Sequence, residues 1–304
     1  MASYPPVSEP HGQEPTRAGL GRVNPEAEPE LLSPSGEFIP PAAADVRPRR
    51  QRPLWAVAPA TYLLVGINCA VYIAMVARGV SFWMPNVDQI MRWGADRPSN
   101  VLIQGEWWRI VTAMFVHVGI LHLATNMWCL WNLGLLAEPL MGSAGLFIAY
   151  ILTGAAGNLL STFHGWVWPI RDPSGAPFFQ AGAGASGAVF GIAGALIVLL
   201  KSKLLPVPAD ELKRLRRSVI YFAAINLVVD VFINFGSGFT GVSVDNSAHM
   251  GGFACGLLMA APMLPRIASP RAAFQTRMRL AVGMIVGLLV LFGFYLAHVP
   301  PPQG

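Results

Sequence analysis

The sequence has 304 residues, of which 54% are hydrophobic and only 12% are charged. A soluble globular domain carries about a quarter charged residues, so this balance excludes an ordinary water-soluble protein and favours the lipid bilayer as solvent. The net charge of +5 comes without a basic cluster interleaved with aromatic residues, and we therefore expect no nucleic-acid partner.

The three cysteines, Cys69, Cys129 and Cys255, lie inside apolar runs and have no C-x-x-C spacing. Such a pattern predicts neither a disulfide framework nor a zinc knuckle, and buried packing is the better account. We expect no cofactor and no metal ion.

The first segment, residues 1–52, is rich in Pro, Glu and Arg and contains no apolar stretch of the kind that forms a signal peptide. This composition predicts a disordered cytoplasmic tail. The first apolar run is then expected to serve as a signal anchor.

Apolar runs long enough to cross roughly 30 Å of hydrocarbon follow along the rest of the chain. They lie at about 55–77, 110–135, 144–163, 185–205, 218–236, 247–265 and 280–298. The pattern predicts an all-α polytopic membrane protein with seven spanning helices, the first six of them within 53–265. Residues 266–304 are expected to form a cytoplasmic linker, a seventh C-terminal transmembrane helix and a short outer tail.

The Lys and Arg residues near the ends of these runs predict the orientation. With the N-terminus in the cytoplasm, fourteen of them lie inside, within 47–52, 201–217 and 266–279, and five lie outside: Arg78, Arg92, Arg97, Arg109 and Arg171. The asymmetry predicts a cytoplasmic N-terminus and an outer C-terminus. Eighteen arginines against three lysines suggest a GC-rich genome, which suits a bacterial plasma membrane.

The first outer loop, at about 78–109, carries five large aromatic side chains among its charges. They are Phe82, Trp83, Trp93, Trp107 and Trp108. We expect the loop to lie in or on the outer leaflet, although ordinary aromatic anchors at the membrane interface would fit the same residues.

Polar side chains at membrane depth are costly, so they are functional candidates by default. The runs contain His117, His122, Asn126, Ser186, Asn226, Asp230, Asn234, Ser247 and His249. If the second run enters from outside near Arg109, His122 lies roughly 20 Å along it and Asn126 one turn deeper. Ser186 and His249 lie a few residues below the outer ends of their runs. The topology therefore places all four in the outer half of the bilayer.

A serine becomes a good nucleophile when a base within hydrogen-bond reach takes its proton, and a histidine has a suitable intrinsic pKa. Small residues in the fourth and sixth runs would let Ser186 and His249 approach each other. Free backbone N–H groups at a helix start could bind an oxyanion, with His122 or Asn126. Asp230 and Asp245 are possible acidic partners of the histidine, but spacing does not decide between them, so we predict a Ser-His dyad.

Other interpretations fit parts of the same pattern. A serine in a Gly-Ala context is commonly a packing residue, and a lone intramembrane His or Asn commonly bonds a neighbouring helix. A transporter could relay protons through His117, His122 and Asp230. A membrane chaperone could bind substrates without cutting them. A zinc site of His117, His122 and His249 is disfavoured, because a five-residue spacing does not put the first two on one helical face.

The ordered motifs resemble the rhomboid family of intramembrane serine proteases over about residues 55 to 298. The matching segments are Glu106-Trp-Trp-Arg109, His117 with His122-x-x-x-Asn126, Gly184-x-Ser186-Gly187, and Ala248-His249-x-x-Gly252-x-x-x-Gly256. The resemblance implies the roles of the site residues. Ser186 would be the nucleophile and His249 the base, while His122, Asn126 and the Ser186 backbone N–H would bind the oxyanion beside Gly184.

The resemblance also implies structural roles and a substrate class. Trp108 and Arg109 would order a loop in the outer leaflet, and Glu138 would brace the core. The substrates would be single-span membrane proteins, cut near the outer end of the span where the helix unwinds easily. Some relatives have a tyrosine four residues after the nucleophile, whereas this chain has Phe190. We expect its ring still to stack on His249.

Overall fold

The computed structural model describes residues 58–202, 205, 207–240, 244–266 and 271–302. The chain divides into two units, Met1–Gln51 and Arg52–Gly304, and all the described residues belong to the second. The tail predicted at 1–52 lies outside them.

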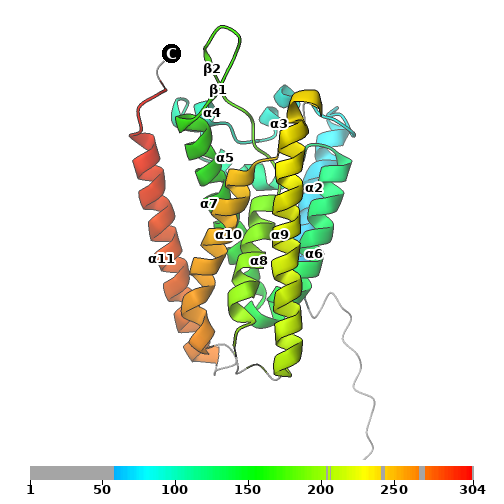
Figure 1. The fold of residues 1–304 in the computed structure, drawn as a ribbon, viewed down its shortest axis with the longest axis vertical. Coiled ribbons are helices and arrows are strands. Elements are labelled where there is room, and N and C mark those ends of the chain that lie inside the picture. The colour runs from blue at the N-terminus through cyan, green and yellow to red at the C-terminus, as the bar shows by residue number, and fades with distance from the viewer. Residues whose placement is uncertain (1–57, 203–204, 206, 241–243, 267–270, 303–304) are drawn as a thin grey trace, which may run out of the picture. The chain divides into compact units, whose positions relative to one another are not determined.

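The second unit is built from long helices that run side by side, and most of the short elements gather at one end, whereas η2 follows α10 at the other (Figure 1). The long helices are α2 (Pro59–Ala77), α6 (Ile120–Met141), α7 (Ser143–Val167), α8 (Ser186–Leu199), α9 (Ala209–Thr240), α10 (Asn246–Ala260) and α11 (Arg271–Ala297). The short elements are α3 (Val87–Arg92), α4 (Pro98–Leu102), α5 (Arg109–Thr112), the 3-10 helices η1 (Ala113–Phe115) and η2 (Ala261–Arg266), and strands β1 (Ile170–Arg171) and β2 (Pro177–Phe178). The two strands pair antiparallel, with Ile170 opposite Phe178.

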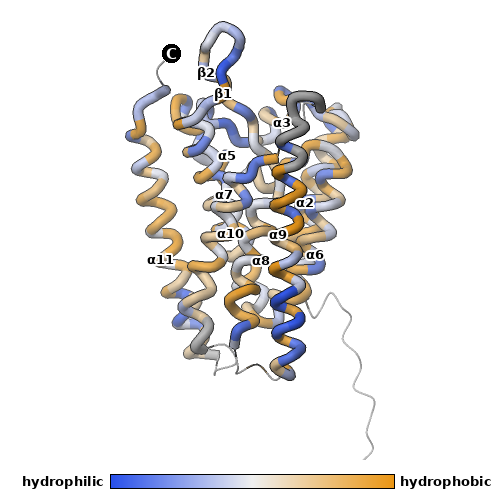
Figure 2. The backbone as a smooth tube through the Cα atoms, in the orientation of Figure 1, coloured by the Kyte–Doolittle hydropathy of each residue, from blue (hydrophilic) through white to orange (hydrophobic). Residues whose placement is uncertain are grey.

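Helix length and composition confirm an all-α polytopic membrane protein. Within the described ranges, four helices are long and apolar enough to cross a bilayer: Pro59–Ala77, Ile120–Met141, Ser143–Val167 and Ala272–Ala297. Apolar residues dominate the middle of the helices, and polar residues gather toward their ends (Figure 2). Helix α11 exposes Val290, Leu291 and Phe294, which suits a surface that faces lipid.

The second predicted span is wrong in its bounds. Instead of one helix from about residue 110, α5 and η1 end at Phe115, and α6 begins only at Ile120. The break ends at Gly119, whose φ of +97° favours glycine, and a Cβ there would lie 2.1 Å from the Trp83 carbonyl oxygen. His122 is therefore in the first turn of its helix and not some 13 residues along it.

Other bounds differ less. Helix α8 begins at Ser186, close to the predicted start at 185, but ends at Leu199. Helices α9 and α11 begin about nine residues before their predicted starts, at Ala209 and Arg271. Their first turns contain charged residues, which hydropathy excludes from a membrane span although they continue the same helix.

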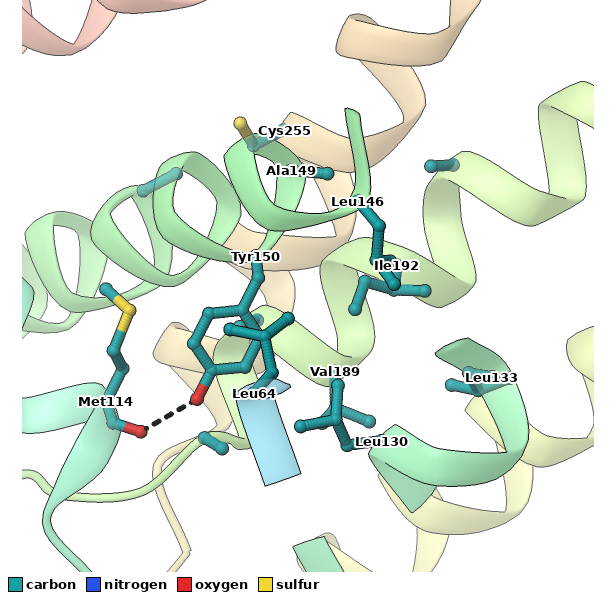
Figure 3. Packing of buried hydrophobic residues seen from close by; sticks show 14 of the residues in the cluster. Leu64, Met114, Leu130, Leu133, Leu146, Ala149, Tyr150, Val189, Ile192 and Cys255 are labelled. Carbon is teal, nitrogen blue, oxygen red and sulfur yellow. Dashed lines mark hydrogen bonds between the residues drawn. The ribbon is translucent and has the colours of Figure 1, made fainter. Parts of the chain in front are cut away.

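A buried core joins α2, α7 and α8 around Tyr150, whose side chain is fully buried. Its hydroxyl donates to the Met114 carbonyl at 3.1 Å and accepts from the Asn68 amide at 3.0 Å. Leu64, Val189 and other apolar side chains surround the ring (Figure 3). Because its polar atom is bonded, the ring can be buried without leaving an unpaired hydroxyl.

Glu138 on α6 caps the start of α2. Its carboxylate accepts hydrogen bonds from the backbone N–H groups of Ala60 and Thr61 at 2.9 and 2.8 Å, and from the Thr61 hydroxyl at 2.7 Å. The first N–H groups of a helix have no partner within the helix, so this carboxylate satisfies them. The bracing expected of Glu138 is confirmed.

Arg109 holds the first outer loop together. Its Nη1 donates to the carbonyls of Met91 and Ala95 at 2.8 and 2.9 Å, and its Nε donates to Glu106 at 2.7 Å. The guanidinium also lies over the Trp108 ring, 4.4 Å from its centroid. The hydrogen bonds from Arg109 and Asn100 lower the pKa of Glu106. Arg109 and Trp108 thus order the loop as expected, and its place in the outer leaflet stays a prediction.

Candidate active site

Ser186 is the first residue of α8, and the turn before it is bound to η1. The N–H of Gly184 donates to the Ala113 carbonyl at 2.9 Å. No side chain caps α8 at Ala185, so the N–H groups of its first turn remain available to a ligand. The helix dipole adds partial positive charge there. Ser186 thus lies at the end of a helix that favours an anion.

His122 lies directly against this turn. Gly184 has a φ of +131°, and a Cβ at that position would lie 2.6 Å from the imidazole Cε1 of His122. Only a glycine at this position, two residues before Ser186, leaves room for the His122 ring. Asn126 is one turn further along α6 and buried, and its amide donates to the His122 carbonyl at 2.9 Å. The structure therefore brings Gly184, His122 and Ser186 together, with Asn126 below His122.

His117 supports the same turn, a role that the sequence alone did not indicate. It is fully buried, and the N–H of Ala185 donates to its Nε2 at 3.4 Å. Its Nδ1 lies 3.4 Å from the Phe115 carbonyl, and since a carbonyl only accepts, the proton belongs on Nδ1. The His117 ring also meets the His122 ring edge to face, with centroids 5.3 Å apart.

His249 comes from the first turn of α10, which packs backbone to backbone against α8. A Cβ on Gly252 would lie 1.9 Å from the Gly187 carbonyl oxygen, and a Cβ on Gly256 would lie 1.9 Å from that of Gly191. This close approach needs glycine on both helices. The His249 ring is buried and stacks on Phe190, with centroids 4.3 Å apart and an interplanar angle of 14°. The expected stack is confirmed.

An acidic partner of His249 is also present. Its Nδ1 lies 2.7 Å from the Asp230 Oδ2 on α9. Asp245, the other acidic candidate, is engaged elsewhere: its Oδ1 accepts from the Ala248 N–H at 2.9 Å, and its Oδ2 accepts from the Ser161 hydroxyl. Because a carboxylate only accepts, Nδ1 carries the proton and Nε2 is left with a free lone pair.

Serine and histidine are not yet joined in this arrangement. Among the hydrogen bonds of the described residues, none links Ser186 to His249. Such bonds are commonly long in a free enzyme and shorten when substrate binds. Both histidines lie near the start of α8, because His122 lies against Gly184 and His249 stacks on Phe190, one turn after Ser186. A nucleophile, a base and anion donors there suit acyl transfer.

The residues that the structure describes contain no group of three or more His, Cys, Asp or Glu side chains that could hold a metal ion. His117 and His122 contact each other, and within the described residues the polar partners of both rings are backbone groups.

The fold and the site together define a polytopic helical membrane protein that gathers a serine, two histidines and a helix start at one end of its bundle. The Rhomboid domain family matches residues 104–266, more than half of the chain. The chain belongs to the rhomboid family.

Relatives of the chain include bacterial and plant proteins. The chain is 31% identical over 244 residues to Rhomboid protease GluP of Bacillus subtilis (strain 168), covering 80% of this chain and 41% of GluP. It is 26% identical over 246 residues to Rhomboid protease AarA of Providencia stuartii, covering 77% of this chain and 83% of AarA. RHOMBOID-like protein 1 of Arabidopsis thaliana is 31% identical over 177 residues, covering 58% of this chain and 39% of that protein. The chain thus spans less than half the length of two of these three relatives.

Proposed function

We propose that this protein is an intramembrane serine endopeptidase that hydrolyses peptide bonds in or near the outer end of transmembrane segments. Ser186 is the nucleophile and His249 is the general base. The N–H groups that start α8 bind the oxyanion together with His122 and Asn126, and Gly184 leaves the room that this site needs. The observation that carries the proposal is the start of α8. There a serine lies at an uncapped helix N-terminus, His122 lies against the preceding turn, and His249 approaches through glycine contacts.

The reaction follows from these groups. Nε2 of His249 takes the proton of the Ser186 hydroxyl while Oγ attacks the carbonyl carbon of the scissile bond. The resulting oxyanion accepts from the N–H groups at the helix start, and each such donor contributes a few kcal/mol to the transition state. His249 then protonates the leaving amine as the C–N bond breaks. A water molecule, deprotonated by His249, hydrolyses the acyl-enzyme and restores Ser186.

The length of α8 supports chemistry below the membrane surface. With 14 residues it spans about 21 Å, less than the roughly 30 Å of the hydrocarbon core. The exposed Lys201 just beyond its far end is suited to the inner interface. A helix anchored there would place Ser186 about 10 Å below the outer boundary of the hydrocarbon.

The substrate class rests on the family. Two bacterial relatives are named as rhomboid proteases. For this chain we infer single-span membrane proteins whose helix unwinds near its outer end, because a hydrogen-bonded helix shields its carbonyls from attack. The catalytic core is assigned to 53–265. The protein is assigned to a bacterial plasma membrane, with its N-terminus in the cytoplasm and its C-terminus outside.

Cleavage of a model single-span substrate in detergent tests the proposal. The parent protein should cut the substrate, and Ser186→Ala should lose at least about 10³-fold in rate, since no nucleophile remains. A fluorophosphonate probe should label the parent at Ser186 and should not label His249→Ala, because a neutral serine without a base reacts slowly.

Ser218→Ala is a matched control, because Ser218 on α9 is exposed and donates only to the Arg214 carbonyl of its own helix. It should cleave and label like the parent. Cleavage by Ser186→Ala at the parent rate would overturn the proposal. So would binding of the substrate by the parent without any cleavage.

A further inference from the structure

Asp230 is a carboxylate on α9 that lies within the fifth predicted span and is 8% exposed. An acidic side chain at the centre of a membrane helix costs about 3 kcal/mol or more, so such residues mark function by default. Its partner, His249, is 4% exposed. The two groups are 19 residues apart in sequence and come from different helices.

The contact between them is a short, directed hydrogen bond. His249 Nδ1 lies 2.7 Å from Asp230 Oδ2, and among the residues that the structure describes His249 is the only hydrogen-bond partner of the Asp230 side chain. A charge-assisted bond of this length in a dry environment is strong and holds both groups in place. Within the described residues, the Asp230 carboxylate therefore bonds His249 and no other group.

The remaining contacts of His249 leave its Nε2 as the working atom. Phe190 covers one face of the ring, and Asp230 occupies Nδ1. Phe190 is one helical turn after Ser186, so the ring stacks on a residue that follows the serine on nearly the same face of α8. With the proton held on Nδ1, the lone pair of Nε2 is free to accept a proton from Ser186.

Asp245 does not compete for this role. It caps α10 by accepting from the Ala248 N–H, and its second oxygen accepts from the Ser161 hydroxyl on α7. Both of its oxygens are thus used to fix the start of α10. Asp245 positions the helix that carries His249, whereas Asp230 contacts the ring itself.

We propose that Asp230 is a positioning residue that completes a Ser186-His249-Asp230 triad, holding the proton of His249 on Nδ1 and stabilising the imidazolium that forms during the reaction. This inference rests on the proposed function and deepens it from a dyad to a triad. The carboxylate itself stays ionised throughout, while the proton of Ser186 moves to Nε2 and then to the leaving amine.

Asp230→Asn is the sharpest test. Asparagine keeps the size of the side chain, but its amide can donate to Nδ1 and so favours the tautomer with the proton on Nε2, which cannot act as a base. We expect kcat to fall about 10² to 10⁴-fold with KM changed less than about twofold, since serine proteases that lose this carboxylate lose up to about 10⁴. Asp230→Glu retains a carboxylate and should recover part of the lost rate.

Two further measurements separate positioning from mere support of the fold. ¹⁵N spectra of histidine-labelled protein should show the Nδ1–H tautomer of His249 in the parent and its loss in Asp230→Asn. A thermal unfolding curve gives the fraction folded at the assay temperature, so the rate is expressed per folded molecule. Asn226→Ala is the matched control, because Asn226 lies one turn earlier on α9 and donates only within its own helix, to Phe222. It should retain the parent rate and the parent tautomer.

The outcomes distinguish the two proposals. If Ser186→Ala is inactive and Asp230→Asn cuts within about threefold of the parent rate, the triad is wrong and the protease assignment stands. The triad is also wrong if the rate lost by Asp230→Asn is fully explained by unfolded protein, or if the His249 tautomer does not change. If the parent itself does not cleave, the proposed function fails before Asp230 is considered.

Discussion

At the scale of single residues, Asp96 has a buried carboxyl group that has no role in the proposed reaction. It lies between α3 and α4 and is 2% exposed. Its Oδ2 accepts from the Thr162 hydroxyl at 3.0 Å, whereas Oδ1 has no partner among the residues that the structure describes. Burial, joined by repulsion from the Asp245 carboxylate and opposed by the Thr162 hydrogen bond, raises the pKa of Asp96 to about 7.

This pKa predicts a pH-dependent stability. In the unfolded chain the group titrates near 3.8, so between about pH 4 and pH 7 the folded state binds more protons than the unfolded state. The free energy of unfolding therefore falls as the pH rises through this range. Asp96→Asn stays neutral, and we expect it to be more stable than the parent at pH 8 by up to about 4 kcal/mol. Thermal unfolding in detergent at pH 5 and pH 8 measures the difference.

Asp172 provides the control, because it lies in the exposed hairpin, where a hydrogen bond from Ser174 lowers its pKa. It is ionised throughout the range from pH 5 to pH 8, so Asp172→Asn should keep the pH dependence of the parent. An Asp96→Asn variant that loses stability between pH 5 and pH 8 as steeply as the parent would contradict a raised pKa.

The polar residues of the site could be identified from the sequence, but which acidic residue bonds His249 could not. Ser186, His249, His122 and Asn126 stand out because polar side chains are rare in apolar runs. Which acid faces His249 depends on how α9 is rotated about its axis, and neither spacing nor hydropathy contains that rotation. Asp230 and Asp245 were therefore equivalent in the sequence and are clearly different in the structure.

At the scale of elements, the site depends on how closely α8 and α10 approach. Gly252 follows His249 by three residues and lies against Gly187, the residue after Ser186. In a bilayer, helices associate through close packing of small residues and gain little from the hydrophobic effect. The same glycine contact that joins the helices therefore also sets the separation of Ser186 and His249.

Gly252→Ala tests this dependence. The added Cβ would lie 1.9 Å from the Gly187 carbonyl oxygen, a backbone atom that can move only if the helices separate. A displacement of about 1 Å between reacting groups can lower the rate about 10²-fold. Overpacking typically lowers the free energy of unfolding by roughly 1–3 kcal/mol. We expect a loss of about 10²-fold in kcat together with a lower melting temperature.

Gly66→Ala is the matched control, because a Cβ at Gly66 on α2 would meet nothing within 4 Å among the described atoms. It introduces the same methyl group into a membrane helix and should leave cleavage and melting unchanged. Parent-like cleavage by Gly252→Ala would show that the spacing of α8 and α10 does not limit the reaction.

The sequence predicted the existence of the long helices well and their ends less well. Apolar runs predict where a helix is surrounded by lipid or protein, but α5, η1 and α6 form one continuous apolar stretch. The break between them exists because Gly119 lies against the backbone of Trp83, 36 residues earlier in the chain. Such a tertiary contact leaves no local signal in the sequence, so His122 was placed too far along its helix.

At the scale of the whole chain, the two ends of α8 differ in charge and connection. Ser186 follows the β1–β2 hairpin, whereas Lys201 and the hydrophilic start of α9 follow the far end of α8 (Figure 2). After Asp210 and Glu211, this part of α9 contains four basic residues: Lys213, Arg214, Arg216 and Arg217. The basic end is expected in the cytoplasm by the positive-inside rule. The candidate site would then open toward the outer face, where the proposed substrates are cut.

Single cysteines can test this orientation. In a variant in which Cys69, Cys129 and Cys255 are replaced, Ser174→Cys marks the exposed hairpin and Asp210→Cys marks the exposed start of α9. A maleimide that cannot cross membranes should label the hairpin in intact cells and the α9 site only after permeabilisation, because the basic turns of α9 are retained inside. Cleavage by the cysteine-free protein at the parent rate shows that the background is folded. The opposite labelling pattern would place Ser186 in the inner half of the bilayer, and substrates would then have to be sought among segments exposed to the cytoplasm.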